Sequence, residues 1–348
     1  MMAGRLRVAL FMGGQSAERE VSLNTGRMIA RHLDKRKYEV VPLEIAADGR
    51  WLADSPVLRE IEAAGHATIE PALVRYASPA TGPLERKLDV VFLALHGPFG
   101  EDGTIQGMLD LVGIPYTCSG VLASALAMDK VRMKAFACGL GNRVAEDALV
   151  TGSEYQRDPA RILAEVSGLA DKVVVKPNCL GSSVATSIID TPDQIAPALE
   201  EVFRLGQEAI VERFLSGVEV AAPVLGNGDP EALPLIEIIP KMGRFYDYRS
   251  KYLEGGSDHI IPAALGSDLS GEVQDQAVEI HTKLGCRGVT RSDFIICGEE
   301  IFFLELNTIP GMTATSLVPQ SAAAAGYCFA RLLDRLIELA LEDPTRQR

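Results

Sequence analysis

A run of six consecutive apolar residues, VVFLAL at 90–95, is the feature that most constrains the fold of this chain. A strand that is apolar at every position must be covered on both faces, which is typical of parallel sheets flanked by helices. Strand patterns at 7–12 and 38–45 bracket a helical spacing at 22–33. This alternation predicts an open α/β sheet, with ligands at the carboxyl ends of its strands.

The later part of the chain has a different pattern. A short strand is predicted at 113–116 and a helix at 121–140. Beyond them the predicted strands follow one another with few helices between, which favours antiparallel pairing. These strands are expected at 171–177, 184–189, 209–214, 219–225, 232–239, 292–296 and 301–306, with a polar loop around 243–260 and a closing helix at 322–341. The sequence therefore predicts an α/β fold with an α+β C-terminal half.

Composition excludes several classes of function. The net charge of −13 disfavours binding to nucleic acid or to an anionic membrane surface. No apolar stretch is long enough to cross a bilayer, and the first residues are interpreted as a strand and not as a signal peptide. The six cysteines include no C-x-x-C pair, which favours reduced thiols in a cytoplasmic protein.

Several common catalytic motifs are absent from the sequence. It contains no P-loop, no G-x-G-x-x-G fingerprint, no H-E-x-x-H and no G-x-S-x-G. A P-loop nucleotide site, a dinucleotide site, a zinc hydrolase and an elbow-type serine hydrolase are therefore disfavoured.

Two carboxylates and an amide near the C-terminal end are the most informative polar residues. Glu305 and Asn307 alternate with leucines, so both side chains point to one side of a strand, and Asp293 can join them from a neighbouring strand. Oxygen ligands of this kind suit Mg²⁺ held together with nucleotide phosphates. Each residue alone would be an ordinary polar side chain facing solvent, but Gly311 follows closely and lets the backbone approach a ligand.

Two lysines and a turn of small residues can supply positive charge and N–H groups for a phosphate. Lys176 ends an apolar strand and Lys130 lies within the predicted helix at 121–140. Singly, each lysine is more often a solvated surface residue. The turn GSS at 181–183 offers backbone N–H groups and two hydroxyls that can surround a phosphate. Together they predict a phosphate-binding loop.

Other candidate residues follow predicted strands. Glu212 can bind adenine or ribose, and it is equally consistent with a plain exit from a strand. Glu18 and His96 lie in the loops GGQSAERE at 13–20 and HGPFGEDG at 96–103, where Glu18 can pair with an ammonium group that His96 orients. The alternatives are a helix N-terminal charge and a loop histidine with satisfied hydrogen bonds. The segment 101–103 is interpreted as a turn.

Six segments, in order over nearly the whole chain, resemble the D-alanine–D-alanine ligase family of the ATP-grasp superfamily. They are GGQSAEREVSLNTG at 13–26, HGPFGEDGTIQGMLDLVGIPYT at 96–117, ASALAMDK at 123–130, VVVKP…GSS at 173–183, FYDY..KY at 245–252 and LELNTIPGMTATSLVP at 304–319. The resemblance implies a three-domain ATP-grasp architecture, in which ATP lies between two antiparallel sheets. The expected domains are an N-terminal α/β substrate domain at 1–118, a central ATP-grasp domain at 119–215 and a C-terminal catalytic domain at 216–348.

The resemblance also implies a reaction. ATP activates one D-alanine as an acyl phosphate, a second D-alanine attacks it, and phosphate leaves through a tetrahedral intermediate. The product, D-alanyl-D-alanine, is a precursor for peptidoglycan synthesis. The expected ligands are ATP, D-alanine and two Mg²⁺ or Mn²⁺ ions, and the expected assembly is a homodimer in the cytoplasm.

The family's site residues are matched at the following positions of this chain, with Arg213 standing where the family usually has lysine. The contacts to ATP match Lys130, Lys176, Ser182, Ser183, Glu212, Arg213, Leu215, Glu219 and Lys251. The metal ligands match Asp293, Glu305 and Asn307. The catalytic and substrate-binding positions match Glu18, His96, Ser182, Tyr252, Arg291, Gly311, Ser316 and Leu317.

The resemblance implies different roles for the catalytic and substrate-binding residues. Glu18 would hold the ammonium group of the first amino acid, with His96 nearby. Arg291 and the Gly311 amide would stabilise the oxyanion, while residues 316–317 would contact the carboxylate of the second amino acid.

Lys251 and Tyr252 match a mobile loop that closes the site. Within it Tyr252 would bond to Ser182, which would in turn bond to Glu18.

Three positions depart from the family pattern. Ala185 stands where glycine is common, Arg213 where lysine is usual and Ile309 where serine is usual. None of them removes a metal ligand, a phosphate lysine or the oxyanion arginine, although Ala185 can stiffen the phosphate-binding loop.

Alternative functions stay open at this point. Tyr252 favours a dipeptide ligase over a ligase that uses D-lactate. A nucleotide-binding regulator without catalysis is disfavoured by the intact metal set. A carboxylate ligase for an unrelated substrate would not need Glu18.

Overall fold

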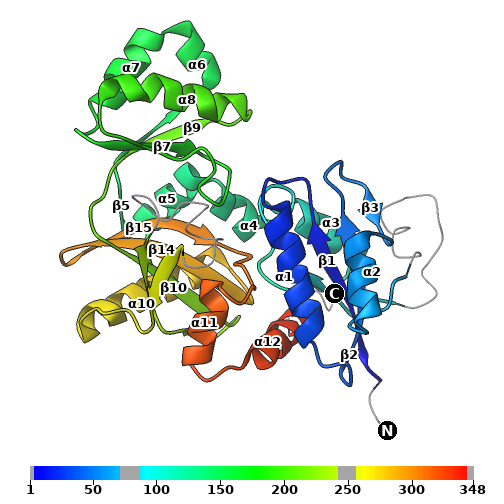
Figure 1. Ribbon diagram of the computed structural model, residues 1–348. Helices are drawn as coiled ribbons and strands as arrows, with labels where there is room; N and C mark the ends of the chain where they lie inside the picture. Colours follow the sequence, from blue (N-terminus) through cyan, green and yellow to red (C-terminus); the bar gives the residue numbers. More distant parts are fainter. Residues whose placement is uncertain (1–3, 71–86, 242–255, 343–348) are drawn as a thin grey trace.

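The computed structural model describes residues 4–70, 87–241 and 256–342, which are built around three sheets (Figure 1). Lys251 and Tyr252, with most of the polar loop predicted at 243–260, lie outside the described residues. In the part of the chain that is described, every helix is too short or too polar to span a bilayer.

The N-terminal sheet, sheet A, has the strand order β3-β2-β1-β4, and its three longer strands run parallel. All four residues of β4 are buried, as the apolar run predicts, because helices cover both faces. On one face α1 packs closely on β1: a Cβ at Gly26 would lie 2.7 Å from the sulfur of Met12. The elements are β1 (Leu6–Gly13), α1 (Arg19–His32), β2 (Tyr38–Ile45), β3 (Trp51–Leu52), α2 (Pro56–Ala63), β4 (Val90–Leu93) and α3 (Thr104–Val112).

A smaller antiparallel sheet, sheet C, lies at the top of Figure 1 with the strand order β6-β9-β7-β8. Its helices pack through Ile162, Leu199 and Val202 on one face, which leaves the other face to form a cleft wall. The elements are β6 (Asp147–Val150), α6 (Gly152–Arg157), α7 (Pro159–Ser167), β7 (Val173–Pro177), β8 (Ser187–Ile189), the 3₁₀ turn η2 (Pro192–Gln194), α8 (Ile195–Arg204) and β9 (Ala209–Arg213).

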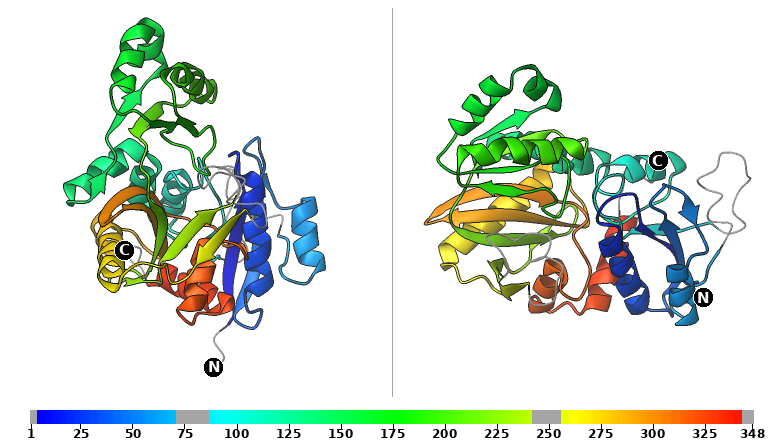
Figure 2. Two further views of the ribbon diagram at one scale, coloured as in Figure 1. Left: turned by 60° about the vertical axis from the view of Figure 1, so that its left-hand side comes forward. Right: turned by 45° about the horizontal axis from the view of Figure 1, so that its top comes forward.

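The third sheet, sheet B, has seven strands in the order β13-β12-β10-β14-β15-β5, with β11 paired to β10. Sheet C lies over sheet B in the right-hand view of Figure 2. The strands are β5 (Arg143–Val144), β10 (Val218–Leu225), β11 (Glu231–Ala232), β12 (Ile236–Pro240), β13 (Ser257–Ile260), β14 (Val289–Cys297) and β15 (Glu300–Asn307). The helices packed on it are α4 (Val121–Met128), α5 (Lys130–Gly139) and α10 (Ser267–Leu284).

Two helices follow sheet B: α11 (Leu317–Ala324) and α12 (Phe329–Leu341). The second returns to the N-terminal sheet, where its buried leucines join the first core. Its Asp334 accepts hydrogen bonds from Tyr38 at 2.8 Å and from Lys37 at 2.6 Å. The C-terminal end of the chain is thereby attached to the sheet that the N-terminal end begins.

Several predicted elements differ in the structure. The strand predicted at 232–239 is two strands, β11 and β12. The helix predicted at 121–140 is two helices, because Asp129 leaves the helical backbone and its side chain accepts the backbone N–H of Arg132, capping α5. The closing helix is also two, separated at Gly326, whose φ is 93°. The strand predicted at 113–116 is one isolated bridge to β4, and residues 257–260 of the predicted polar loop form strand β13.

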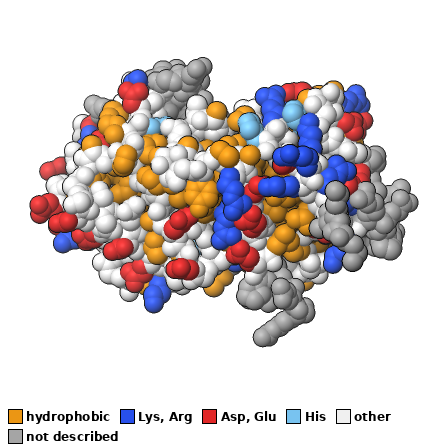
Figure 3. Space-filling view, turned by 90° about the horizontal axis from the view of Figure 1, so that it is seen from below, with side chains coloured by type: hydrophobic (Ala, Val, Ile, Leu, Met, Phe, Trp, Pro, Cys, Tyr) orange, Lys and Arg blue, Asp and Glu red, His pale blue; other side chains and the backbone are white. Residues whose placement is uncertain are grey.

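The surface seen from below carries charged side chains of both signs interspersed with apolar ones (Figure 3). Lysine and arginine gather mainly on the right of that view. The two sites described next depend on local groups of charge, which the overall balance of −13 does not reveal.

Candidate functional site

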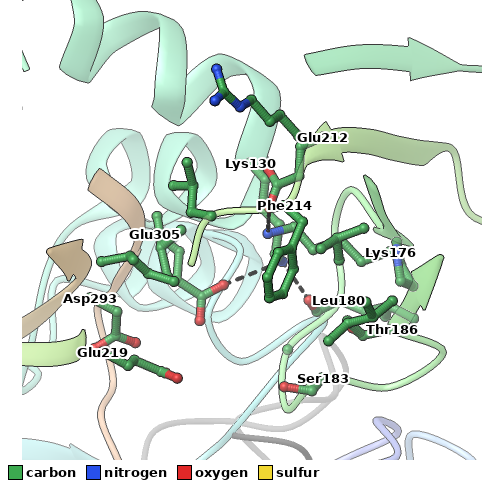
Figure 4. Close-up of a pocket in the computed structure, with 18 residues that line it drawn as sticks. Lys130, Lys176, Leu180, Ser183, Thr186, Glu212, Phe214, Glu219, Asp293 and Glu305 are labelled. Atoms are coloured by element: carbon green, nitrogen blue, oxygen red, sulfur yellow. Dashed lines mark hydrogen bonds and ion pairs between the residues drawn. The ribbon is translucent and has the colours of Figure 1, made fainter. Parts of the chain in front are cut away.

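A cleft between sheets C and B, here called the first cleft, collects residues from β7, β8 and β9 above and from β10, β14 and β15 below. It encloses about 920 Å³, part of it open to solvent. Of the predicted ATP and metal residues, it is lined by Lys130, Lys176, Ser183, Glu212, Arg213, Leu215, Glu219, Asp293 and Glu305. Figure 4 shows Asp293, Glu219 and Glu305 on one side of this cleft and Lys176, Thr186 and Ser183 on the other.

The lysine of β7 is held by a buried acid on β9. Lys176 donates to one carboxylate oxygen of Glu212, and Lys134 donates to the other at 3.1 Å. Burial opposes the charge on Glu212, but the two lysines outweigh it and hold the pKa of this carboxyl below its ordinary value. Burial likewise opposes the charge on Lys176, and Glu212 and Glu305 outweigh it, so the pKa of Lys176 is raised. Both residues are therefore charged.

Lys130 connects the two sides of the first cleft. It is the first residue of α5, and its ammonium group donates to the Leu180 carbonyl at 2.6 Å. The same nitrogen lies 3.8 Å from a carboxylate oxygen of Glu305 (Figure 4). The ammonium group of Lys130 thus lies between the loop at 180–183 and Glu305 on β15.

Part of the lining of the first cleft is apolar. Phe214 lies there, and Lys172 approaches its ring to within 4.3 Å of the centroid. Apolar side chains from both sheets complete this wall: Val174, Ile188, Leu215, Ile295 and Leu304. A flat apolar slot beside charged groups suits a purine base with attached phosphates.

The predicted metal residues lie on adjacent antiparallel strands. Asp293 on β14 is the cross-strand partner of Glu305 on β15, and Arg291 is the partner of Asn307. Arg291 donates to both oxygens of Asp293, each at 2.7 Å, and the Asn307 amide donates to Asp293 at 3.1 Å. The ladder register therefore gathers two carboxylates, an amide and a guanidinium in one place.

The loop after β7 has an unusual backbone. Ser182, Ser183 and Ala185 all have positive φ, at 53°, 55° and 51°. Left-handed residues close together turn successive N–H groups to one side, which makes a concave anion-binding surface. The Ser182 hydroxyl donates to Glu18, so this loop is attached to the N-terminal part of the chain.

A second cleft lies on the other side of that loop. Its lining includes the remaining described site residues, namely Glu18, His96, Ser182, Arg291, Asn307, Gly311, Ser316 and Leu317, together with Glu101, Ile309 and Thr315. Gly181 lines both clefts. A Cβ at Gly181 would lie 2.8 Å from a Glu18 carboxylate oxygen, so glycine permits this close approach. The two clefts thus meet at residues 181–183.

His96 is buried between two carboxylates. Its Nε2 lies 3.1 Å from the Thr25 hydroxyl, and its Nδ1 lies 3.7 Å from Glu101. Burial opposes the charge, but Glu101 first and Glu18 next outweigh it, so the pKa of His96 is raised above its usual value near 6.5.

We therefore expect Glu101→Gln to lower the pKa of His96. Because the folded-state pKa is raised, the stability from this pair is fully present below about pH 6.5 and is lost as the pH rises through the folded pKa. NMR titration of the histidine ring protons measures the shift, with Asp102→Asn as the neighbouring control. An unchanged His96 pKa in Glu101→Gln would contradict the assignment.

Sequence reasoning missed several residues of the site. Lys134 lies four residues after Lys130 on α5, a spacing that places both on one helix face and was available as a signal. Glu101 was interpreted as part of a turn, although it follows His96 within the same loop. Phe214 and the apolar wall carry no polar signal that distinguishes them from core residues.

Comparison with known proteins identifies the family. The model described as "D-ala D-ala ligase N-terminus" matches residues 7–119, and the one described as "D-ala D-ala ligase C-terminus" matches residues 139–338. The chain belongs to the D-alanine–D-alanine ligase family. The predicted resemblance is therefore confirmed, and so is the predicted reaction class of an ATP-dependent ligase.

Relatives in this family match over their full length. The D-alanine–D-alanine ligase of Syntrophobacter fumaroxidans is 43% identical over 344 residues, which covers 99% of this chain and 100% of the relative. That of Desulforudis audaxviator is 41% identical over 337 residues, covering 97% and 99%.

Solved structures of the family share the ATP-grasp fold, which confirms the predicted architecture. The Coxiella burnetii D-alanine–D-alanine ligase superposes with a TM-score of 0.78 at 30% identity, covering 99% of this chain and 96% of that one. The Bacillus anthracis ligase complexed with ATP gives 0.75 at 31%, covering 99% of both chains. The VanG D-Ala:D-Ser ligase of Enterococcus faecalis gives 0.79 at 30%, covering 97% and 100%.

The departure at Ala185 gives a prediction for this member of the family. Its φ of 51° lies in a region that alanine tolerates at a cost and a β-branched residue resists more strongly. We expect Ala185→Val to raise the KM for ATP about tenfold, which corresponds to about 1.4 kcal/mol beyond the strain that alanine already has. Ala185→Gly should stay within about twofold. Steady-state ADP release measures both, and equal KM values for the two variants would show that this backbone conformation does not matter.

Proposed function

We propose that this chain joins two D-alanines into D-alanyl-D-alanine, with ATP converted to ADP and phosphate, as a cytoplasmic step in peptidoglycan precursor synthesis. One observation carries the proposal: the charged first cleft and the second cleft meet at residues 181–183. A phosphoryl group bound in one can therefore reach a carboxylate bound in the other.

The second cleft suits the first amino acid at its Glu18 end. Glu18 is 6% exposed and accepts a hydrogen bond from Ser182, so its charge is directed and partly desolvated. An ammonium group bound there gains a strong ion pair. Because His96 lies nearby with a raised pKa, it can hold a proton and orient the carboxylate side of the substrate.

The first cleft suits the phosphates and base of ATP. Phosphoryl transfer depends on positioning and charge neutralisation, with little covalent help from the protein. Lys130 and Lys176 supply positive charge, and the left-handed loop supplies N–H groups. The apolar side chains that line the same cleft, Phe214 among them, would hold the base.

The acidic residues fit a divalent cation. Asp293 and Glu305 face each other across the ladder, and Asn307, which donates to Asp293 through its amide nitrogen, has its amide oxygen as the ligand atom. This all-oxygen set suits Mg²⁺ or Mn²⁺, with nucleotide phosphates completing the coordination. When bound, the cation neutralises phosphate charge. We propose two ions, as the family resemblance implies.

The other end of the second cleft suits the attacking amino acid. Leu317 begins α11, and Ser316 is its N-cap with no side-chain bond to the helix. The unpaired N–H groups at a helix N-terminus favour a carboxylate. Arg291 and Gly311 line the same cleft, and their N–H groups would stabilise the tetrahedral oxyanion. Attack there breaks the bond to phosphate, which leaves with the carboxylate oxygen that it gained.

A second function, a ligase that accepts D-serine or D-lactate as the attacking substrate, is kept open by one comparison. The VanG D-Ala:D-Ser ligase has the same fold over its whole length. The acceptor end of the cleft is formed by Thr315, Ser316 and Leu317, of which two carry hydroxyls that can bond to an acceptor side chain. Tyr252, the residue that favours D-alanine, lies outside the described residues.

The proposal includes three structural statements. We propose a division into domains near residues 118 and 215; the separate core of sheet C supports a distinct central unit, whereas residues 121–144 pack on sheet B and α12 joins the core of sheet A. We propose a homodimer, as the family resemblance implies. We also propose small-molecule substrates in place of nucleic acid or membrane, and the acidic net charge supports this last statement.

Phosphate release with single and paired substrates tests the proposed function. D-alanine with ATP and Mg²⁺ should give phosphate and dipeptide in equal amounts, and L-alanine should give neither. D-Serine or D-lactate added to this mixture should not replace the second D-alanine in the product. A mixed product in preference to D-alanyl-D-alanine would replace the proposed function by the second one, and no phosphate release with any of them would refute both.

A further inference from the structure

The turn that leads into α11 has a defined internal structure. The Thr313 N–H donates to the Ser316 hydroxyl oxygen at 2.9 Å, and the Ser316 N–H donates to the Thr313 carbonyl at 3.1 Å. The two hydroxyls lie 2.8 Å apart. These bonds close the turn on itself. The hydroxyl of Thr315, a residue that lines the second cleft, lies 3.4 Å from that of Thr313, and the Thr315 carbonyl accepts a bond from outside the turn.

That bond comes from Gln320, in the first turn of α11. Its amide nitrogen donates to the Thr315 carbonyl at 2.8 Å. Because a carbonyl can only accept, the amide oxygen of Gln320 is directed away from it. That oxygen lies 3.2 Å from Nδ1 of His259. An amide oxygen also only accepts, so Nδ1 carries a proton and donates to it.

The chain of bonds starts at the edge of sheet B. His259 belongs to β13, the edge strand, and its Nε2 lies 3.0 Å from the Ser257 hydroxyl. The order His259, Gln320, Thr315 therefore runs from an edge strand to the wall of the second cleft. The two bonds of His259 are half-buried, where a hydrogen bond meets less competition from water, and the bond from Gln320 to the Thr315 carbonyl is exposed.

Helix α11 does not need these hydrogen bonds in order to pack on sheet B. Leu317 is 3% exposed and packs with Ala221, Ile236 and Ile238. Ser321 also donates to the Pro234 carbonyl at 2.6 Å. Since these contacts attach α11 to sheet B independently, loss of the Gln320 bonds should act on the turn and leave the fold intact.

We propose that Gln320, held by His259, is a positioning residue for the second amino acid. It fixes the Thr315 carbonyl and, through it, the turn that presents Ser316 and the start of α11. This inference rests on the proposed function, because it takes the attacking amino acid to bind at that turn.

Gln320→Met tests the proposal, because methionine has a similar length and makes neither bond. We expect the KM for the second D-alanine to rise about five- to tenfold, which is the worth of about one net hydrogen bond. The KM for ATP, the KM for the first D-alanine and kcat should stay within about twofold. Rates over a wide range of D-alanine concentrations, fitted with two KM values, separate these quantities.

Variants of His259 test whether it acts through Gln320. His259→Phe should raise the same KM, and His259→Asn should restore it because its amide nitrogen replaces Nδ1. His259→Phe combined with Gln320→Met should be no worse than Gln320→Met alone, since His259 acts through Gln320. Gln274→Met is the matched control: it removes a glutamine bond to the Leu233 carbonyl, neither residue lines either cleft, and no KM should change.

Two results would overturn the inference. One is an unchanged KM for the second D-alanine in Gln320→Met, and the other is an equal change in all kinetic constants with a lowered unfolding temperature. Failure of the proposed function is distinguishable, because the unchanged protein would then form no dipeptide.

Discussion

Glu305→Gln should lower kcat/KM about 10³-fold, the largest loss expected from one substitution that keeps the size of the side chain. The variant loses one of the two carboxylates that face each other across β14 and β15 and also the charge 3.8 Å from Lys130. Charge stabilisation by a bound cation is worth several kcal/mol, and about 4 kcal/mol corresponds to 10³ in rate.

The same strand offers a control for this prediction. Glu300 is also on β15, but it is exposed and pairs with Arg143 at the edge of the sheet. Glu300→Gln should therefore stay within about twofold, since an exposed pair contributes at most about 1 kcal/mol. Phosphate release measured over a range of Mg²⁺ concentrations should show partial recovery of Glu305→Gln at high Mg²⁺. Near-normal activity of Glu305→Gln at low Mg²⁺ would exclude it as a metal ligand.

Arg291→Lys should lower kcat by about 10²–10³, the usual cost of one donor to a developing oxyanion. Lysine keeps the charge but cannot make the two parallel bonds by which Arg291 holds Asp293. The KM for ATP should change less than kcat, because the loss falls mainly on the transition state.

Arg143→Lys is the matched control for that variant. Arg143 pairs with Glu300 on the surface, so the same substitution should leave both constants within about twofold. Steady-state kinetics with ATP and D-alanine each varied separates the two effects. A rise in the KM for ATP at constant kcat would assign Arg291 to nucleotide binding and not to the oxyanion.

The proximity of the proposed metal ligands was predictable from the sequence because it depends on short-range geometry. Alternation fixes Glu305 and Asn307 on one face of a strand. The same rule also places Arg291 and Asp293 on one face of β14, so their pairing follows from the spacing. What the sequence does not give is the register between the two strands, which a bulge after Asp293 adjusts.

Other parts of the fold depend on contacts that a local pattern cannot show. The segment 121–140 has a continuous helical pattern, but Asp129 caps a new helix and thereby places Lys130 at a helix start. The return of α12 to sheet A is set by Asp334 and Tyr38, which are far apart in sequence. The meeting of the two clefts likewise depends on Glu18 and Ser182, whose contact only the folded chain forms.

Transfer of ¹⁸O from substrate to phosphate tests the central claim that the two clefts share one phosphoryl group. If a D-alanine carboxylate oxygen attacks the γ-phosphorus of ATP, that oxygen leaves with phosphate when the second amine attacks. With D-alanine labelled in both carboxylate oxygens, each phosphate released should carry one ¹⁸O. Phosphate without label, formed together with dipeptide, would contradict the account.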